Sequence, residues 1–158
     1  MIRRAKNTDI DRLNELLYQV QRLHAEGYPD IFKLGAKKYT TEELEKIIGD
    51  DLTPIFVYED GGVVLGYAFC VYQLTEENHQ VYRRKVLYID DLCVDNNCHR
   101  QGIGSMLYRH VVQTAVDNDC DSVTLNVWHM NDGALRFYES MGMSPLKTTM
   151  ENKLHKTG

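Results

Sequence analysis

The amino-acid sequence predicts an α/β protein with a mixed sheet of six or seven strands flanked by about four helices. Short apolar segments alternate with helical patterns in the order β-α-α-β-β-β-α-β-α-β. A hairpin turn lies between two of the apolar segments, and a glycine-rich turn joins a strand to a helix. With 158 residues the chain can bury a sizeable core, so we expect one domain over residues 1–158.

The first strand and the first helix are expected close to the N-terminus. A short strand over residues 2–6 precedes Thr8, which is predicted to cap the helix. Apolar residues then recur at helical spacing and predict one core-facing stripe, formed by Ile10, Leu13, Leu16, Leu17, Val20 and Leu23.

A second helix and a hairpin are predicted next. Thr40 and Glu43 form a capping-box pattern, which predicts that a helix begins here. The turn sequence at residues 60–62 (DGG) separates two apolar segments, residues 55–59 and 63–72. These two segments are predicted to pair as antiparallel strands.

The second half of the chain is predicted to alternate strands with helices. Residues 86–94 (VLYIDDLCV) and 121–129 (DSVTLNVWH) both have the composition of strands. Between them, a helix is expected to open within the glycine run, with an apolar stripe formed by Ile103, Leu107, Val111, Val112, Ala115 and Val116. A last strand is expected over residues 146–152.

The glycine-rich turn at residues 99–105 (HRQGIGS) is suited to an anion, because it lets backbone N–H groups converge at a helix N-terminus. A dinucleotide fold would need a third glycine where Leu107 stands, and a triphosphate loop would need a lysine after Gly104. A third pattern, Gln/Arg-x-x-Gly-x-Gly/Ala, binds the pyrophosphate of acetyl-CoA. Gly102 and Gly104 match it, with His99 at its first position. A plain tight turn is the remaining interpretation.

A second motif favours the acetyl-CoA interpretation. Residues 131–143 (NDGALRFYESMGM) match the pattern Asn-x-x-Ala-x-x-Phe-Tyr-x-x-x-Gly-Phe/Met, in which Asn131 begins a short helix and Gly142 ends it. With both motifs in order, the chain resembles the GNAT superfamily of acetyl-CoA-dependent N-acetyltransferases. The resemblance implies a GNAT-like fold in which two splayed strands, residues 86–94 and 121–129, hold the pantetheine arm.

The resemblance also implies which residues bind acetyl-CoA. Backbone amides near the end of the first splayed strand would meet the thioester carbonyl, at Leu92, Cys93 and Val94. The pyrophosphate would lie on the glycine loop, formed by His99, Arg100, Gln101, Gly102, Ile103, Gly104 and Ser105. Asn131 and Ala134 of the second motif complete this set. His99 departs from the family, which prefers Gln or Arg at this position.

Tyr138 is the residue that the resemblance assigns as the general acid, because the family uses the tyrosine of its Phe-Tyr motif. A phenol with a pKa of about 10 can protonate a departing thiolate without being ionised itself near neutral pH. The alternative is that Tyr138 packs with Phe137 as ordinary core.

Asp90 is the candidate base or amine-binding carboxylate, because relatives with a base on this strand carry it at the positions of Asp90 and Tyr88. Strict alternation would place Tyr88, Asp90, Leu92 and Val94 on one face and Ile89, Asp91 and Cys93 on the other. Cys93, a conceivable acyl carrier, would then point away from Asp90. Alternatively, the two carboxylates form salt bridges, with Arg83, Arg84 or Lys85 as partners.

The acceptor site is expected to involve the segment after the first helix, where this fold usually walls the substrate. Tyr28 and Phe32 lie there beside acidic residues, which suits an amine with an apolar body, and Tyr88 is a further candidate for substrate binding. Equally, the loop could pack on its own aromatic residues. Asn126 stands where ribosomal-protein alanine acetyltransferases carry a catalytic glutamate, so protein N-terminal acetylation by that mechanism is disfavoured.

Composition restricts the partners. A net charge of −5 argues against nucleic acid and suits a cationic substrate. The absence of an apolar run of membrane-spanning length, and of a signal peptide, predicts a cytoplasmic protein without a membrane association. The histidines and cysteines show no metal-binding spacing, so no metal site is expected, and the cysteines are expected to be reduced thiols.

The sequence therefore predicts an N-acetyltransferase that moves an acetyl group from acetyl-CoA to a primary amine of a small molecule by direct transfer. Two alternatives are a protein or peptide acetyltransferase acting on lysines or N-termini, and a non-catalytic acyl-CoA-binding regulatory module. Dimers are common in the family, so a homodimer is the assembly that the resemblance suggests.

Overall fold

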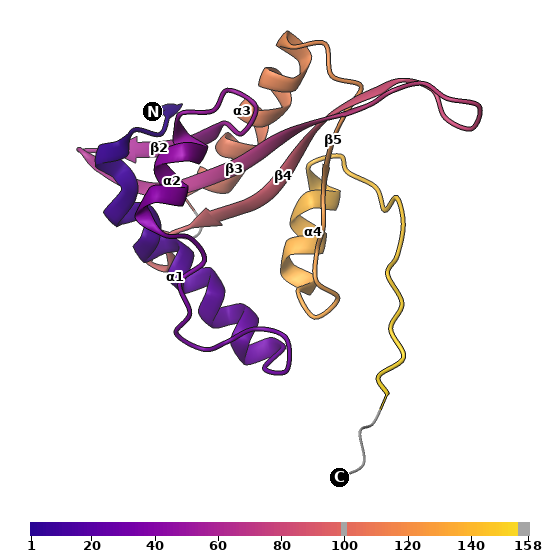
Figure 1. Cartoon of the computed structure of the whole chain (residues 1–158). Coiled ribbons are helices and arrows are strands. Elements are labelled where there is room, and N and C mark those ends of the chain that lie inside the picture. The colour runs from indigo at the N-terminus through magenta and orange to yellow at the C-terminus, as the bar shows by residue number, and fades with distance from the viewer. Residues whose placement is uncertain (99–100, 155–158) are drawn as a thin grey trace. The chain divides into compact units, whose positions relative to one another are not determined.

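The computed structural model describes residues 1–98 and 101–154 (Figure 1). The chain forms two compact units, Met1–Asn126 and Val127–Gly158, which are described separately. Within the described ranges, no helix is long and apolar enough to cross a membrane.

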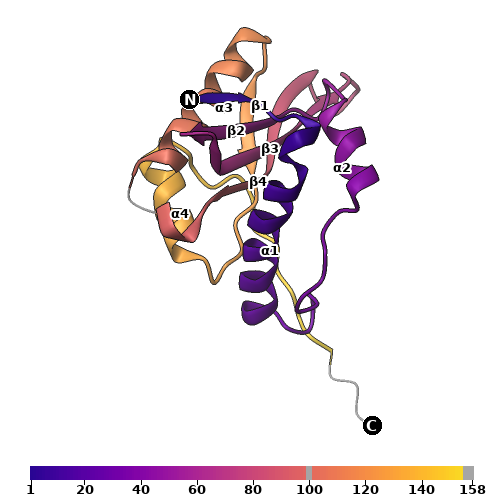
Figure 2. The same ribbon diagram turned by 90° about the vertical axis from the view of Figure 1, so that its left-hand side faces the viewer.

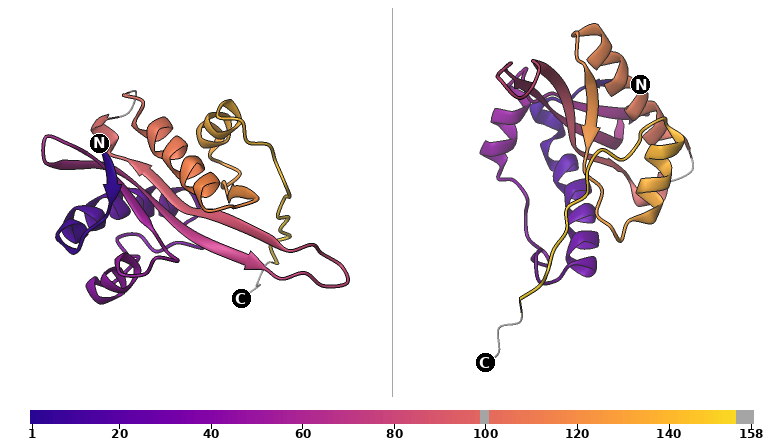
Figure 3. Two further views of the ribbon diagram at one scale, coloured as in Figure 1. Left: turned by 90° about the horizontal axis from the view of Figure 1, so that it is seen from above. Right: turned by 90° about the vertical axis from the view of Figure 1, so that its right-hand side faces the viewer.

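The first unit is built on a five-stranded mixed sheet. Its strands follow the chain order β1-β2-β3-β4-β5 and comprise β1 (Ile2–Arg4), β2 (Ile55–Asp60), β3 (Val63–Thr75), β4 (Arg84–Val94) and β5 (Ser122–Leu125). The first three pairings are antiparallel and the β4–β5 pairing is parallel. Figure 3 shows that β3 and β4 run on together as a long two-stranded extension.

Helices cover both faces of this sheet. α1 (Ile10–Gly27) and α2 (Thr41–Ile48) lie on one face, and α3 (Ile103–Asp117) lies on the other, as Figure 2 shows. The core on the α1–α2 side is formed mainly by Leu13, Leu16, Leu17, Leu44, Ile55, Val57, Tyr67 and Phe69. On the α3 side, Gly66 allows close approach, since a Cβ there would lie 2.9 Å from the carbonyl oxygen of Cys93 and 3.1 Å from Leu107.

The expected order of elements is confirmed up to α4, but the prediction of six or seven strands is wrong. No strand follows β5 among the described residues, and the expected strand at residues 146–152 has no regular structure. Leu146 is 70% and Met150 is 87% exposed. A strand needs a neighbour for its backbone hydrogen bonds, and alternating apolar residues alone do not provide one.

Two boundaries also differ from the sequence-based expectation. Thr8 does not cap α1, because residues Asn7–Asp9 form a 3-10 turn in which the Asp9 carboxylate accepts from the backbone N–H of Lys6 (2.8 Å) and pairs with Arg3. The predicted strand at residues 121–129 stops at Leu125, where its pairing with β4 ends.

The second unit contains α4 (Asp132–Ser140). Its predicted caps are confirmed: the Asn131 side chain accepts from the Ala134 N–H (3.1 Å), and Gly142 follows the helix in the left-handed region, with φ of +99°. The Met143 N–H then donates to the Tyr138 carbonyl (3.0 Å), as expected for a left-handed helix end.

A partly buried ion pair fixes the turn that follows β4. Arg12 of α1 binds the Asp95 carboxylate and also donates from Nε to the Val64 carbonyl (2.8 Å). Asp95, which is 7% exposed, additionally accepts from the Asn97 N–H (3.1 Å). These hydrogen bonds hold the pKa of Asp95 below its usual value. The ion pair therefore ties α1 to the start of the loop that leads into α3.

We predict that Asp95→Ala lowers the free energy of unfolding by about 2 kcal/mol, because it leaves the Arg12 guanidinium without its buried partner. Urea unfolding at pH 7 measures this loss. Asp51→Ala is the control, since Asp51 pairs with Arg4 while its side chain is 97% exposed, and it should leave stability unchanged. Because the pKa of Asp95 is lower in the folded state, the contribution is present above the unfolded pKa, about 3.9, and disappears as the pH falls through the folded value. Equal stability of the wild type and Asp95→Ala at pH 7 would contradict the prediction.

Candidate active site

A β-bulge in β4 is the central feature of the candidate site. Phe69 of β3 pairs with Asp91 and Cys70 pairs with Ile89, so Asp90 is the extra residue on β4. A bulge of this kind bends the strand and redirects its side chains.

The bulge changes which residues share a face of the sheet. Directly opposite residues of an antiparallel pair lie on the same face, and Val71, Phe69 and Tyr67 of β3 oppose Tyr88, Asp91 and Cys93. Phe69, Tyr67 and Cys93 belong to the core beneath α1 and α2. Asp91 and Cys93 therefore share the face of Tyr88. The expected grouping of Tyr88 with Asp90, Leu92 and Val94 is wrong, because strict alternation breaks at Asp90.

Asp90 pairs with residues that come from the loop between α1 and α2. Lys38 Nζ lies 3.3 Å from Asp90 Oδ2, and the Tyr39 hydroxyl donates to the same oxygen at 3.4 Å. The Asp90 side chain stays 34% exposed. The expected salt bridge of this carboxylate is thus present, but its partner is Lys38. The suggested alternatives differ: Arg84 binds Ser122 and the Lys85 ammonium binds the Asn118 carbonyl.

Asp91 lies deeper and is held by a buried phenol. The fully buried Tyr67 donates its hydroxyl to Asp91 Oδ2 at 2.6 Å. Burial raises the pKa of Asp91, and this effect outweighs the Tyr67 hydrogen bond and the positive charge of Lys38, which both lower it. A carboxylate with a raised pKa accepts a proton more readily than an ordinary surface aspartate.

Stacked aromatic rings hold both phenols in place. Tyr39 stacks on Phe69 with ring centroids 5.9 Å apart and planes 6° apart, and Tyr67 meets the same Phe69 edge-on at 4.9 Å. The Phe69 ring therefore positions one hydroxyl on Asp90 and the other on Asp91.

Tyr88 borders the same cluster. Its hydroxyl accepts from Asn126 Nδ2 at 3.2 Å, and burial raises its pKa, with the negative charge of Asp90 acting in the same direction. Asn126 thus contacts a residue of the candidate site, in the position where the alanine acetyltransferases carry their glutamate.

Cys93 is a structural residue. It is buried, as predicted, and its thiol donates to the Leu16 carbonyl at a sulfur–oxygen distance of 3.9 Å. Burial raises the pKa of Cys93 to about 12, and that of the buried Cys70 likewise to about 12. A thiol in this state is a poor nucleophile near neutral pH, which argues against an acyl-carrier role for Cys93.

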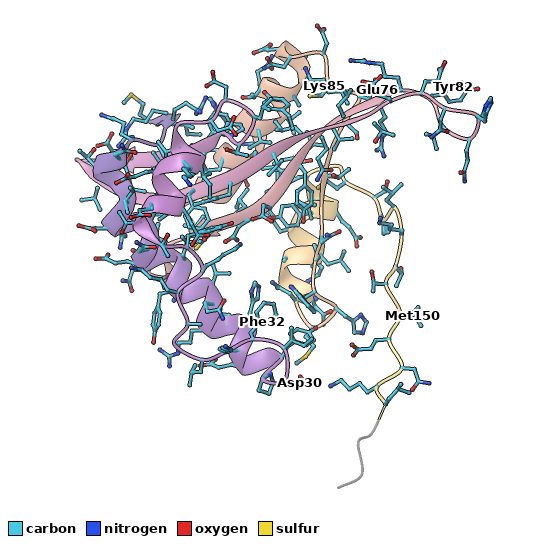
Figure 4. All side chains as sticks on the ribbon, in the orientation of Figure 1. Asp30, Phe32, Glu76, Tyr82, Lys85 and Met150 are labelled. Atoms are coloured by element: carbon cyan, nitrogen blue, oxygen red, sulfur yellow. The ribbon has the colours of Figure 1, made fainter. Side chains whose placement is uncertain are left out.

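The loop after α1 carries the predicted substrate residues. The N–H of Phe32 donates to the Tyr28 carbonyl (2.9 Å), and the Phe32 ring lies 4.8 Å from the His24 ring. Figure 4 shows Phe32 and Asp30 in this loop at the end of α1. His24, on the last turns of α1, interacts electrostatically with Asp91. The substrate role of Tyr28 and Phe32 stays a prediction.

Beyond the bulge, one edge of β4 is open. Pairing with β5 ends at Ile89 and Leu125, although β4 continues to Val94. The N–H of Asp95 donates to Leu65 of β3 (2.8 Å). Backbone directions alternate along a strand, so the amide of Cys93 also faces β3, while those of Leu92 and Val94 face the open edge. Of the three predicted amides, the geometry favours Leu92 and Val94.

The glycine loop leads directly into α3. Gly102 adopts a left-handed conformation with φ of +75°, and the first helical hydrogen bond runs from the Met106 N–H to the Gly102 carbonyl. The amides of Ile103, Gly104 and Ser105 consequently have no acceptor within the helix, and first-turn amides of this kind can bind an anion. Gln101 is exposed beside them. His99 and Arg100 lie outside the described residues, so their predicted roles stay predictions.

The second unit holds the predicted general acid. Tyr138 lies on α4, and its ring contacts that of Phe137 at 5.0 Å with planes 68° apart. The contact with Phe137 that the alternative interpretation requires is therefore present, and the catalytic role stays a prediction. Among the described residues, no group of His, Cys, Asp and Glu is placed to hold a metal ion.

Comparison with known proteins defines the class of this enzyme. The model of the Acetyltransferase (GNAT) family matches residues 17–143, which include β2 to β5, the β4 bulge, the glycine loop and α4. The chain therefore belongs to the GNAT acetyltransferase family and is an N-acetyltransferase of this type.

Individual relatives agree with this assignment. The thialysine N-epsilon-acetyltransferase of Bos taurus is 24% identical over 152 residues, which cover 92% of this chain and 85% of that protein. Human N-alpha-acetyltransferase 30 is 40% identical over 55 residues, which are 35% of this chain and 15% of that protein. A crystal structure of a mutant BH1408 protein from Bacillus halodurans is 28% identical with a TM-score of 0.95, covering 98% of this chain and 99% of that one.

Several residues of the site were not predicted from the sequence. Lys38, Tyr39 and Tyr67 approach the aspartates from a distant loop and from β3. One feature of the sequence is compatible with the bulge: on either side of the two aspartates the aliphatic residues change from odd positions (Leu87, Ile89) to even positions (Leu92, Val94), although Val86 stands at an even position as well. Such a change of phase at adjacent aspartates is typical of an inserted residue.

Proposed function

We propose that this protein acetylates a primary amine of a small molecule, using acetyl-CoA as the acetyl donor in a direct transfer. The observation that carries the proposal is the carboxylate pair at the β4 bulge, beside a backbone edge left open by β5. The carboxylates would attract and deprotonate an ammonium group, and the open edge would receive the thioester arm.

The described residues suit acetyl-CoA. The amides at the start of α3 could bind the pyrophosphate, since Gly102 lets the chain turn without a side chain in the way. The open-edge amides of Leu92 and Val94 could hydrogen-bond the pantetheine arm and the thioester carbonyl. Asn131 and Ala134, the N-cap and first-turn pair of α4, would complete the binding set as the family motif suggests.

Within this proposal the two aspartates have different roles. Asp90, which is partly exposed and pairs with Lys38, would add negative charge beside the substrate cation. Asp91, whose pKa is raised by burial, would accept the proton, directly or through water. The neutral amine nitrogen then attacks the thioester carbon and the carbon–sulfur bond breaks. Tyr138 would give its proton to the sulfur and recover one from the acetylated nitrogen.

The choice of a small acceptor rests on the long match with the thialysine N-epsilon-acetyltransferase, which by its name acetylates the ε-amine of thialysine. The shorter match with N-alpha-acetyltransferase 30 favours a second candidate, acetylation of protein N-termini. A panel of small amines and of peptides with free N-termini, assayed for release of CoA thiol, separates the two. If acetyl-CoA binds and no acceptor releases thiol, the protein is a regulatory binding module.

We predict that acetyl-CoA raises the melting temperature, and that Gly102→Val weakens its binding at least tenfold. Valine disfavours the left-handed conformation of Gly102, so the loop would lose its shape. Calorimetry measures the dissociation constant. Gly62→Val introduces comparable strain in the β2–β3 turn, where φ is +82°, and should leave acetyl-CoA binding unchanged. No binding of acetyl-CoA to the wild type would refute the cosubstrate assignment.

We predict that Tyr138→Phe lowers kcat about 100-fold while the affinity for acetyl-CoA stays unchanged, because only the proton donor is removed. Steady-state kinetics with a thiol reagent and calorimetry measure both quantities. Tyr82→Phe, on the exposed β3–β4 hairpin, is the matched control (Figure 4). An unchanged kcat in Tyr138→Phe would refute the acid role.

We predict that Asp91→Asn lowers kcat about 100-fold, whereas Asp90→Asn mainly raises KM for the amine. In the wild type, kcat should fall as the pH falls through the raised pKa of Asp91, because the protonated carboxyl cannot accept a proton. Tyr67→Phe removes a hydrogen bond that lowers this pKa and should move the acid limb to higher pH. The control variant Tyr58→Phe in β2 should leave the acid limb at its wild-type pH. A wild-type profile in Asp91→Asn would exclude Asp91 as the base.

A further inference from the structure

A cation of the protein itself pairs with one of the two bulge carboxylates. The Lys38 ammonium lies 3.3 Å from Asp90 Oδ2 and 5.4 Å from the centre of the Tyr39 ring, so it has both an anionic and an aromatic contact. Burial opposes the positive charge of Lys38, but Asp91 and Asp90 outweigh this and raise its pKa. Lys38 therefore stays protonated near neutral pH.

The neighbours of Lys38 keep it in this position. Tyr39 stacks on Phe69, and the next residue, Thr40, caps α2. The Thr40 hydroxyl accepts from the Glu43 N–H (3.1 Å), and the Glu43 carboxylate accepts from the Thr40 N–H. The residues that follow Lys38 are thus fixed to the sheet and to a helix. The ammonium is a built part of the site.

The charges around the bulge leave one negative charge uncompensated. Asp90 and Asp91 contribute two negative charges, and Lys38 contributes one positive charge. His24 also interacts electrostatically with Asp91, but burial lowers the pKa of His24, so it is mainly neutral near pH 7. One ammonium group of a substrate balances this charge. A second ammonium group nearby would be repelled by the positive charge of Lys38.

We propose that Lys38 is a specificity-determining residue: its ammonium neutralises one of the two bulge carboxylates, so that the site takes acceptors with a single positive charge and discriminates against diamines. This inference rests on the proposed amine acetylation and names the class of acceptor.

The test compares two acceptors of equal length, n-pentylamine and 1,5-diaminopentane. The measured quantity is the ratio of their kcat/KM values, diamine over monoamine. Lys38→Met removes the charge and keeps an unbranched apolar side chain, and it should raise this ratio at least tenfold relative to the wild type. Lys38→Arg keeps the charge and should restore the wild-type ratio. A merely structural role would not predict this rescue.

Lys37→Met is the matched control, because Lys37 is the exposed neighbour on the same loop, and its ratio should equal that of the wild type. An unchanged ratio in Lys38→Met would overturn the proposal. If kcat/KM rises equally for both amines, the ratio is unchanged, and Lys38 only blocks the site. Lys38→Gln serves the same comparison if Lys38→Met does not fold. Acetylation of Lys38 itself, detected by mass spectrometry, would show that it is an acceptor and would also overturn the proposal.

The same variants separate this inference from the proposed function. Calorimetry with the two amines, without acetyl-CoA, gives the ratio of dissociation constants independently of turnover. If the wild type acetylates no amine but Lys38→Met still shifts the binding ratio toward the diamine, the proposed function fails and the role of Lys38 stands. If amines are acetylated and neither ratio moves, only the role of Lys38 fails.

Discussion

The β-bulge at Asp90 is the constraint on which the candidate site depends. With one extra residue in β4, Asp91 comes to lie opposite Phe69 and on the face beneath α1 and α2. Without it, Asp91 would lie on the α3 face, away from the Tyr67 hydroxyl. The bulge therefore places one carboxylate where burial raises its pKa and leaves its neighbour partly exposed. Two identical side chains, adjacent in the chain, acquire different chemistry through their surroundings.

The hydrophobic core supports this arrangement directly. Phe69 packs in the core and contacts the rings of both phenols, so the same residue that fills the space under α1 also sets the two hydroxyls. Core packing restricts ring orientation far more than an exposed loop could. The loop between α1 and α2 is consequently part of the site, because Tyr39 joins it to Phe69 and Lys38 joins it to Asp90.

The open edge of β4 and the turn after it both lie beyond the point where pairing with β5 ends. β5 pairs with β4 only as far as Ile89, so the amides of Leu92 and Val94 face an edge on which the described part of the chain places no strand. Arg12 and Asp95 then fix the chain where it leaves the sheet, before it enters the glycine loop. A single strand thus carries the two carboxylates and the open-edge amides, and it leads into the glycine loop. All of these segments lie within residues 17–143, which the GNAT family model matches.

The sequence by itself determined the family, the order of elements through α4, both caps of α4 and the positions of the two motifs, because capping, glycine turns and apolar spacing are local properties. Only the tertiary structure decided the number of strands, since the local sequence of residues 146–152 does not create a pairing partner. It also decided the faces of β4 and the partners of its aspartates. Lys38 and Tyr67 lie 52 and 24 residues from the carboxylates that they bind, and no local pattern encodes such contacts. They arise when the sheet and its covering loop come together around Phe69.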